Sequence, residues 1–134
     1  MCEEPFETVD TRCLYFPEEN LVSVNETSHL KTGYSNAANI CQAVQAKLLA
    51  RPTPEKPLTA IEKQALKAYF GFERYWVLDL ENDCLVGNKN GALLSKLDLA
   101  SEADAETKAM ALQSNYGTDN CARANQFVCE RTFG

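Results

Sequence analysis

The chain has 134 residues, 45% of them hydrophobic, and a formal net charge of −6. This length fits one domain around a single core, and the hydrophobic fraction excludes an intrinsically disordered chain. The acidic balance argues against a nucleic-acid partner, because a protein that binds phosphate groups needs a basic face. No apolar run reaches the roughly 20 residues that a membrane-spanning helix needs. We therefore expect one domain over residues 2–134 with no membrane span.

Six cysteines, at positions 2, 13, 41, 84, 121 and 129, show neither a C-x-x-C spacing nor a cysteine–histidine cluster. A structural zinc site is therefore disfavoured, and the even number predicts disulfides formed in an oxidising compartment. We expect a secreted, extracellular domain in which Met1 is an expression start in place of a removed leader. The triplet Asn25-Glu26-Thr27 predicts N-glycosylation at Asn25, which fits that location. Spacing alone leaves every pairing of the six cysteines open.

The N-terminal stretch 2–16 is predicted to be a hairpin with a turn at Asp10-Thr11 and a strand that continues to Phe16. A bridge between Cys2 and Cys13 would stabilise it, because an isolated hairpin is marginal in water. Residues 17–31 are polar and do not alternate, so we predict a loop with at most one short strand.

Two helices are predicted. The first covers residues 34–47 with Thr32 as its N-cap, because apolar residues recur there at three- and four-residue steps. Its stripe comprises Tyr34, Ala37, Ala38, Cys41, Val44 and Leu48. A proline-rich loop over 51–58 follows, and Thr59-Ala60-Ile61-Glu62 then carries the capping-box pattern of a helix that ends at Gly71. The inner face of this second helix is expected to comprise Ile61, Ala65, Leu66, Tyr69 and Phe70.

The remaining apolar stretches predict strands. Residues 75–80 form the central strand, with Trp76, Leu78 and Leu80 on one face. Two short apolar runs, 84–87 and 92–94, flank Asn90-Gly91, which is a strong hairpin signal. The last strands are expected at 110–112 and 126–130.

The order of these features resembles the C-type lectin-like domain over nearly the whole chain. The resemblance rests on the Tyr34 to Cys41 helix spacing, the strand around Trp76, and the ending Cys121 to Phe127-Val128-Cys129-Glu130. It implies an α+β fold with two helices packed on a disulfide-bonded, mostly antiparallel sheet, and a long loop region from about 83 to 120. Within residues 101–112 the resemblance implies a loop and then a strand, whereas local propensity favours a helix that begins at Ser101.

The resemblance also implies how the cysteines pair. It connects Cys41 with Cys129, and it connects Cys2 with Cys13, as in the family's longer form with an extra N-terminal bridge. The remaining family bridge joins the cysteine at Cys121 to one near position 109, where this chain has Ala109. We expect Cys84 to take that place.

The family's sugar-binding members hold calcium with a Glu-Pro-Asn or Gln-Pro-Asp loop and a Trp-Asn-Asp element. The matching places here are Glu102-Ala103-Asp104 and Tyr116-Gly117-Thr118, so the proline and one ligand pair are missing. Calcium needs about six to eight oxygens, and a cis bond without proline costs about 3 kcal/mol. We therefore expect no resident metal ion or cofactor, although loose calcium binding is compatible with the remaining carboxylates. The candidate ligand-binding residues of this degenerate site are Glu102, Asp104, Glu106, Asp119 and Asn120.

Two functions from different classes remain open. One is a calcium-independent recognition module of the defence or adhesion type, which binds a protein partner through its long loop or its acidic surface. The other is a carbohydrate-binding lectin with a rearranged site. Catalysis has no support, because His29 is the only histidine and no nucleophile motif accompanies it. The sequence leaves a homo-oligomer open.

Overall fold

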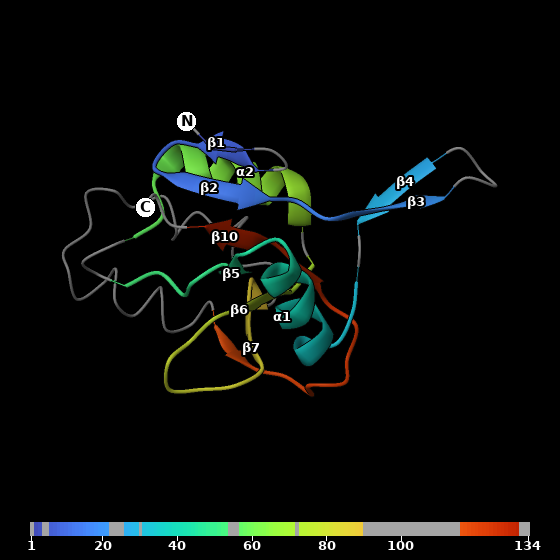
Figure 1. The fold of residues 1–134 in the computed structure, drawn as a ribbon. Coiled ribbons are helices and arrows are strands. Elements are labelled where there is room, and N and C mark those ends of the chain that lie inside the picture. Colours follow the sequence, from blue (N-terminus) through green and yellow to red (C-terminus); the bar gives the residue numbers. More distant parts are fainter. Residues whose placement is uncertain are drawn as a thin grey trace.

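The computed structural model describes residues 2–3, 6–21, 26–29, 31–53, 57–71, 73–89 and 116–131. No helix in this part of the chain is long and apolar enough to cross a membrane. Figure 1 shows how the elements are arranged. In chain order they are β1 (Glu7–Val9), β2 (Arg12–Tyr15), β3 (Glu18–Leu21), β4 (Glu26–His29), α1 (Tyr34–Ala43), β5 (Lys47–Leu48), α2 (Ala60–Phe70), β6 (Tyr75–Val77), β7 (Leu85–Gly87), β8 (Gly117–Thr118), β9 (Gln126–Phe127) and β10 (Cys129–Arg131).

The strands form two four-stranded sheets and a separate hairpin. The first sheet is antiparallel and has the order β1-β2-β10-β5, and the second has the order β8-β7-β6-β9. All neighbours in the second sheet are antiparallel except β6 and β9. The hairpin of β3 and β4 extends away from both sheets (Figure 1). The expected α+β architecture with mostly antiparallel sheets is therefore confirmed.

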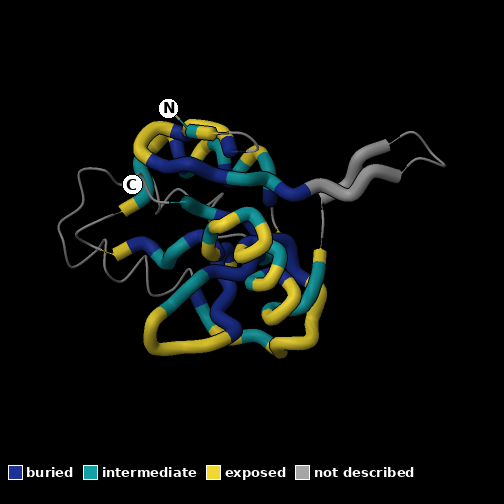
Figure 2. Tube along the Cα trace, viewed as in Figure 1, coloured by how far each residue is buried: buried dark blue, intermediate teal, exposed yellow. Residues whose placement is uncertain are grey.

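Each helix covers one of two buried clusters, which share the strand β6. Tyr75 stacks on Phe70 of α2 with ring centroids 4.2 Å apart, and Val77 belongs to the same cluster. Trp76, the residue between them, lies in the other cluster with Ala37 of α1 and Phe127 of β9. The alternation of a strand thus presents Trp76 to α1 and its two neighbours to α2. Figure 2 shows that β6 and β7 are buried between the exposed outer surfaces.

The second helix begins and ends where its sequence predicts. Thr59 is the N-cap: its side chain accepts a hydrogen bond from the Glu62 backbone N–H, and the Glu62 carboxylate accepts one from the Thr59 N–H. Gly71 follows the last turn with a φ of 60°, which a glycine adopts at little cost. The expectation that Ile61 belongs to the inner face is wrong, because this side chain is 61% exposed.

The first helix is shorter than predicted. It ends at Ala43 because Gln45 adopts a positive φ, and Leu48 belongs to strand β5. Gly33 is the N-cap, without a side-chain hydrogen bond, so the expectation of Thr32 as the cap is wrong. Thr32 instead accepts a hydrogen bond at its carbonyl from the Trp76 indole, 2.7 Å away.

The strands differ from the predicted ones at two places. The polar stretch 17–31 contains two strands, β3 and β4, because backbone pairing does not require an apolar face. Leu80 does not share a buried face with Trp76, since β6 ends at Val77 and the Leu80 side chain is 97% exposed. The predicted strands at 92–94 and 110–112, and the conflict over 101–112, lie outside the described residues.

The three expected disulfides are confirmed: Cys2–Cys13, Cys41–Cys129 and Cys84–Cys121. Cys41–Cys129 connects α1 with β10 across a sequence separation of 88 residues. In the chain-entropy account, a bridge over a segment of this length stabilises the folded state by about 4–5 kcal/mol.

A buried group of charges connects the N-terminal hairpin, α2 and β10. The Arg12 guanidinium, 3% exposed, lies 3.1 Å from Glu62 and 2.9 Å from Glu130. Glu62, which is fully buried, also accepts hydrogen bonds from the backbone and hydroxyl of Thr11. Burial raises the pKa of Glu62, but the hydrogen bonds from Thr11, Thr59 and Arg12 together outweigh burial and lower it. The carboxylate is thus held ionised inside the protein.

Trp76→Ala should lower the free energy of unfolding by about 3–5 kcal/mol, because it leaves a cavity between α1 and the second sheet. Leu80→Ala, a change on the same chain segment at an exposed side chain, should stay within about 0.5 kcal/mol of the parent protein. Urea unfolding monitored by circular dichroism measures both. A Trp76→Ala protein as stable as the Leu80→Ala control would contradict the packing described here.

Glu62→Gln should destabilise the protein at pH 7 by an amount on the order of 3 kcal/mol, since it removes one charge from a buried pair. The lowered pKa of Glu62 means that its contribution is complete above the pKa of an unfolded glutamate, about 4.3, and is lost as the pH falls through the lower folded value. The free energy of unfolding should therefore fall less steeply with decreasing pH in Glu62→Gln than in the parent. The same pH dependence of the free energy of unfolding in both proteins would contradict this role of Glu62.

Candidate functional site

The candidate site lies at the end of the second sheet where the long loop region begins and returns. Of the five expected ligand-binding residues, Asp119 and Asn120 are described, and they are adjacent after β8. Glu102, Asp104 and Glu106 lie outside the described residues, as does Asn25, the expected glycosylation site. The described part of the site is therefore its rim, which we define as loop 79–84 and segment 119–124.

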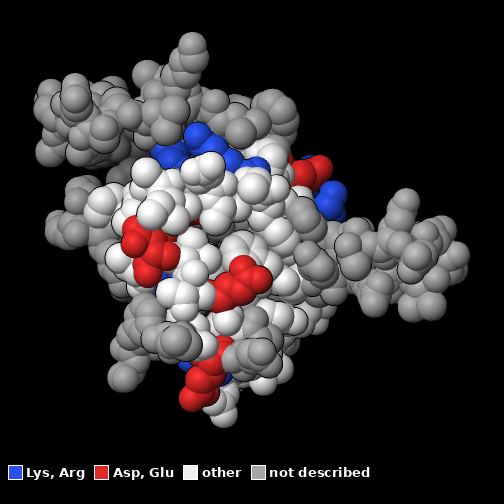
Figure 3. Space-filling view, turned by 90° about the horizontal axis from the view of Figure 1, so that it is seen from above, with Lys and Arg blue, Asp and Glu red and all other residues white. Residues whose placement is uncertain are grey.

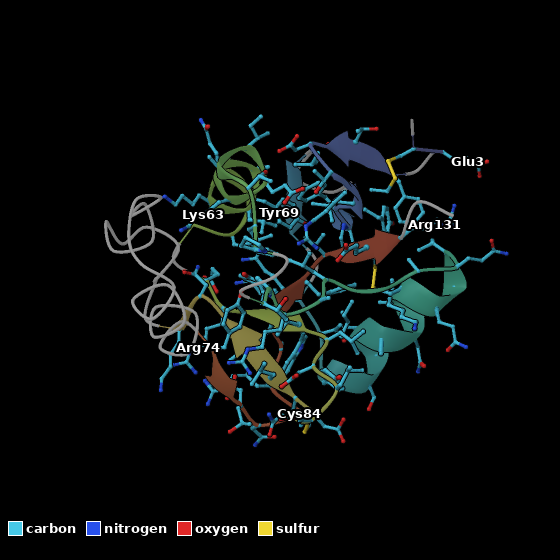
Figure 4. All side chains as sticks on the ribbon, turned by 90° about the vertical axis from the view of Figure 1, so that its left-hand side faces the viewer. Glu3, Lys63, Tyr69, Arg74, Cys84 and Arg131 are labelled. Carbon is cyan, nitrogen blue, oxygen red and sulfur yellow. A yellow bond between two sulfur atoms is a disulfide. The ribbon has the colours of Figure 1, made fainter. Side chains whose placement is uncertain are left out.

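Strand pairing and one disulfide join the two parts of this rim. Leu85 of β7 lies opposite Thr118 of β8, and the Asp119 N–H donates to the Cys84 carbonyl at 3.0 Å. The bridge from Cys84 to Cys121 then connects loop 79–84 with segment 119–124. Figure 4 shows Cys84 at the periphery of the molecule, at the end opposite to the N-terminal hairpin. The ends of the long loop region are thus held by both backbone and covalent contacts.

The last position of β7 requires a glycine, Gly87, because two rings pack against its backbone. A Cβ atom at Gly87 would lie 2.7 Å from Cζ of Tyr75 and 2.8 Å from Cε1 of Tyr116. These rings pack directly over the backbone of β7. Asn88 follows with a positive φ, and its buried side-chain amide donates to the Gly71 and Glu73 carbonyls at 2.8 and 2.7 Å. The end of β7 is therefore fixed to the residues that follow α2.

The Asp119 carboxylate is surrounded by protein donors. Its Oδ1 accepts from the Asn120 N–H at 2.8 Å and lies 3.2 Å from Arg123 Nε. Its Oδ2 accepts from the Asn125 amide at 3.0 Å and lies 3.9 Å from Arg74 Nη1. The side chain is only 7% exposed. Both oxygens are thus turned into the protein.

These contacts set the charge of Asp119. Burial raises its pKa, but the hydrogen bonds from Asn125 and the Asn120 backbone and the positive charges of Arg123 and Arg74 together lower it. The carboxylate is ionised at neutral pH, and its negative charge is balanced by two guanidinium groups. A cation at this place would have to compete with both arginines.

Asn120 has a structural role in the same turn. Its Oδ1 accepts from the Ala122 N–H, and its carbonyl accepts from the Arg123 N–H, each at 2.9 Å. An asparagine side chain that bonds to the backbone two residues later is a common turn device. The residue itself is exposed.

Sequence reasoning missed Arg74, Arg123 and Asn125 as partners of Asp119. The separation of four residues between Asp119 and Arg123 was a weak signal in the sequence. Arg74 precedes the central strand and has no such signal, because only the pairing of β6 with β7 and of β7 with β8 brings it near Asp119.

Loop 79–84, the other half of the rim, is acidic. Asp79 accepts a hydrogen bond from Asn82, the main cause of its lowered pKa, and it lies 3.5 Å from Arg51. Burial and the charges of Asp83 and Asp79 raise the pKa of Tyr34 at the start of α1. The loop therefore carries negative potential up to the edge of α1, and Leu80 projects from it.

The described acidic side chains do not gather in one patch on the face seen from above, where Figure 3 shows them as separate groups. No group of three or more histidine, cysteine, aspartate or glutamate side chains that could hold a metal ion occurs among the residues described. All six cysteines are in disulfides.

No family model matches the chain, and no curated protein matches it. Solved structures do. The mouse scavenger receptor C-type lectin carbohydrate-recognition domain is similar with a TM-score of 0.50, 16% identity and 100% of each chain covered. The cow C-type carbohydrate-recognition domain of CD23, solved in the presence of a GlcNAc2Man3 oligosaccharide, is similar with a TM-score of 0.51, 17% identity and coverage of 100% of this chain and 98% of that chain. The chain has the C-type lectin-like fold, and identities this low show the fold alone.

Asp119→Ala should lower the free energy of unfolding by about 1–3 kcal/mol, because it leaves the buried amide of Asn125 without this acceptor. The matched control is Glu81→Ala, which removes an exposed carboxylate from the other half of the rim and should change stability by less than about 0.5 kcal/mol. Thermal unfolding without added metal compares the two. Equal stability of both variants would mean that Asp119 does not hold the turn.

Proposed function

We propose that this domain is a secreted, non-catalytic recognition module that binds a protein partner without calcium. The observation that carries the proposal is the state of Asp119. It is the one expected carboxylate ligand among the described residues. Its oxygens accept hydrogen bonds from Asn120 and Asn125 and form ion pairs with two arginines.

The electrostatics of this place oppose a calcium site. Calcium takes about six to eight oxygen ligands, most often from several carboxylates and carbonyls. Here the ion would lose much of the attraction of Asp119, because Arg74 and Arg123 lie at 3.9 and 3.2 Å from its oxygens. The adjacent Asn120 side chain already accepts from Ala122. The rim therefore supports binding that does not depend on the ion.

Two further observations support the secreted and non-catalytic parts of the proposal. All six cysteines are paired, which fits an oxidising compartment and leaves no thiol nucleophile. His29, the only histidine, is in the hairpin of β3 and β4, whereas the rim is at the end of the second sheet. A nucleophile with an adjacent base, as acyl-transfer chemistry needs, is therefore hard to assemble at the rim.

For the partner, the rim offers a rigid base with exposed groups. Leu80 is almost fully exposed, and Glu81 and Asp83 beside it are exposed as well. Rigid presentation lowers the entropy lost on binding, so a small exposed surface on such a base can contribute more affinity than the same groups on a free loop. We assign the partner-binding surface to the rim together with the long loop region.

The second candidate function is a carbohydrate-binding lectin with a rearranged site. Its support is that similar solved structures are carbohydrate-recognition domains. In that case Glu102, Asp104 and Glu106 would supply the ligands that Asp119 does not. A glycan array with calcium and with chelator distinguishes this function from protein recognition.

Calcium at about 2 mM should raise the melting temperature by no more than about 2 °C relative to excess chelator, since a site half-occupied at that concentration adds only about 0.4 kcal/mol. Affinity for the protein partner should be equal in both buffers. The matched pair Glu102→Gln and Glu81→Gln should behave like the parent protein. A large calcium-dependent shift that Glu102→Gln abolishes and Glu81→Gln keeps would establish the lectin function instead.

A further inference from the structure

The Cys84–Cys121 disulfide differs from the other two bridges in how far solvent reaches it. Cys41 and Cys129 are both fully buried, and the N-terminal bridge combines a buried Cys13 with a half-buried Cys2. Cys84 is buried, but Cys121 is an exposed residue. A thiolate must reach a sulfur to begin exchange, so access selects among bridges that are otherwise chemically alike.

The backbone at Cys84 adds a second difference. Its φ of 58° lies in the left-handed region, which a residue with a side chain adopts only when its surroundings enforce it. Two contacts hold Cys84 in place here: the disulfide itself and the hydrogen bond from the Asp119 N–H to the Cys84 carbonyl at 3.0 Å. Opening the disulfide removes one of these contacts and lets the backbone strain relax. Reduction is therefore favoured at this bridge by both access and strain.

The bridge holds a local part of the molecule. The Cys121 carbonyl accepts from the Tyr34 N–H at 2.9 Å, which fixes segment 119–124 against the first turn of α1. On the other side, Cys84 ends the exposed loop that carries Leu80. The fold as a whole depends on a different bridge, because the fully buried Cys41–Cys129 joins α1 with β10.

We propose that Cys84–Cys121 is a redox-sensitive switch, which an external dithiol opens selectively and which removes the covalent connection between the two halves of the rim while the fold remains. This inference does not depend on the nature of the partner or on calcium. It requires only that Cys84–Cys121 is reduced before the other two disulfides.

Reduction of this bridge proceeds by two thiol–disulfide exchanges. A thiolate of the dithiol attacks Sγ of Cys121, a mixed disulfide forms, and Cys84 leaves as a thiolate that takes up a proton. The second thiol of the reductant then attacks the reductant sulfur that is bonded to Cys121. This step closes the reductant's disulfide and releases the Cys121 thiolate, which is protonated in turn. The dithiol is oxidised to a disulfide, and the protein gains two thiols.

Graded dithiothreitol treatment of the folded protein, followed by iodoacetamide and peptide mass spectrometry, tests the order of reduction. Cys84 and Cys121 should be alkylated together, at least about tenfold faster than Cys41 and Cys129 and ahead of Cys2 and Cys13. Far-UV circular dichroism should be unchanged at that point, and amide hydrogen exchange should increase at 119–124. Reduction of Cys84–Cys121 only together with Cys41–Cys129, or after Cys2–Cys13, would overturn the proposal.

Two double variants serve as matched controls. Cys84→Ser with Cys121→Ser should show the faster hydrogen exchange at 119–124 without any reductant, whereas Cys2→Ser with Cys13→Ser should leave that segment as in the parent. If the first variant does not fold, the order of alkylation in the parent protein still decides. Unchanged exchange at 119–124 in a folded Cys84→Ser, Cys121→Ser protein would show that the bridge does not hold the rim.

Discussion

The segment from Gln126 to Arg131 belongs to both four-stranded sheets, and the positions of the other elements depend on it. Its first half pairs in parallel with β6, and its second half pairs with β2 and β5 in the other sheet. Val128, between the two halves, is fully buried, and its carbonyl accepts from the Leu49 N–H at 3.0 Å. Cys129 adds the covalent connection to α1. The two sheets, and the helix on each side of β6, are therefore fixed relative to one another by six consecutive residues.

The buried charges around Arg12 connect this segment, through Glu130, with α2 and the N-terminal hairpin. Glu62 caps its own helix and at the same time bonds to Thr11 and Arg12 of the N-terminal hairpin, while Glu130 connects Arg12 with the backbone of Ala50. A buried ion pair adds little net stability, because desolvation of the two charges offsets much of their attraction. We infer that the network fixes the angle of α2 against the sheet.

The same distinction between structural and ligand-binding charges bears on the rim. Asp119 occupies a place where a cation ligand was expected, but Arg123 of the same turn and Arg74, which precedes β6, neutralise it. Its negative charge therefore stabilises the turn that carries Cys121, and the rim becomes a rigid base with an exposed loop beside it. The proposed recognition without a bound ion rests on this arrangement.

The sequence by itself determined the elements whose signals are local. The capping box at Thr59 and the apolar run around Trp76 predicted α2 and the central strand. The pairing of the cysteines was not determined by their spacing, and it came instead from the resemblance to the C-type lectin-like domain. Tertiary structure alone decided that Leu80 is exposed, because the strand ends at Val77. It also decided that Asp119 lies near Arg74, because strand pairing brings together residues that are far apart in the sequence. Propensity, capping and periodicity act over a few neighbouring residues, whereas the partner of a charge is chosen by the packing of the whole chain.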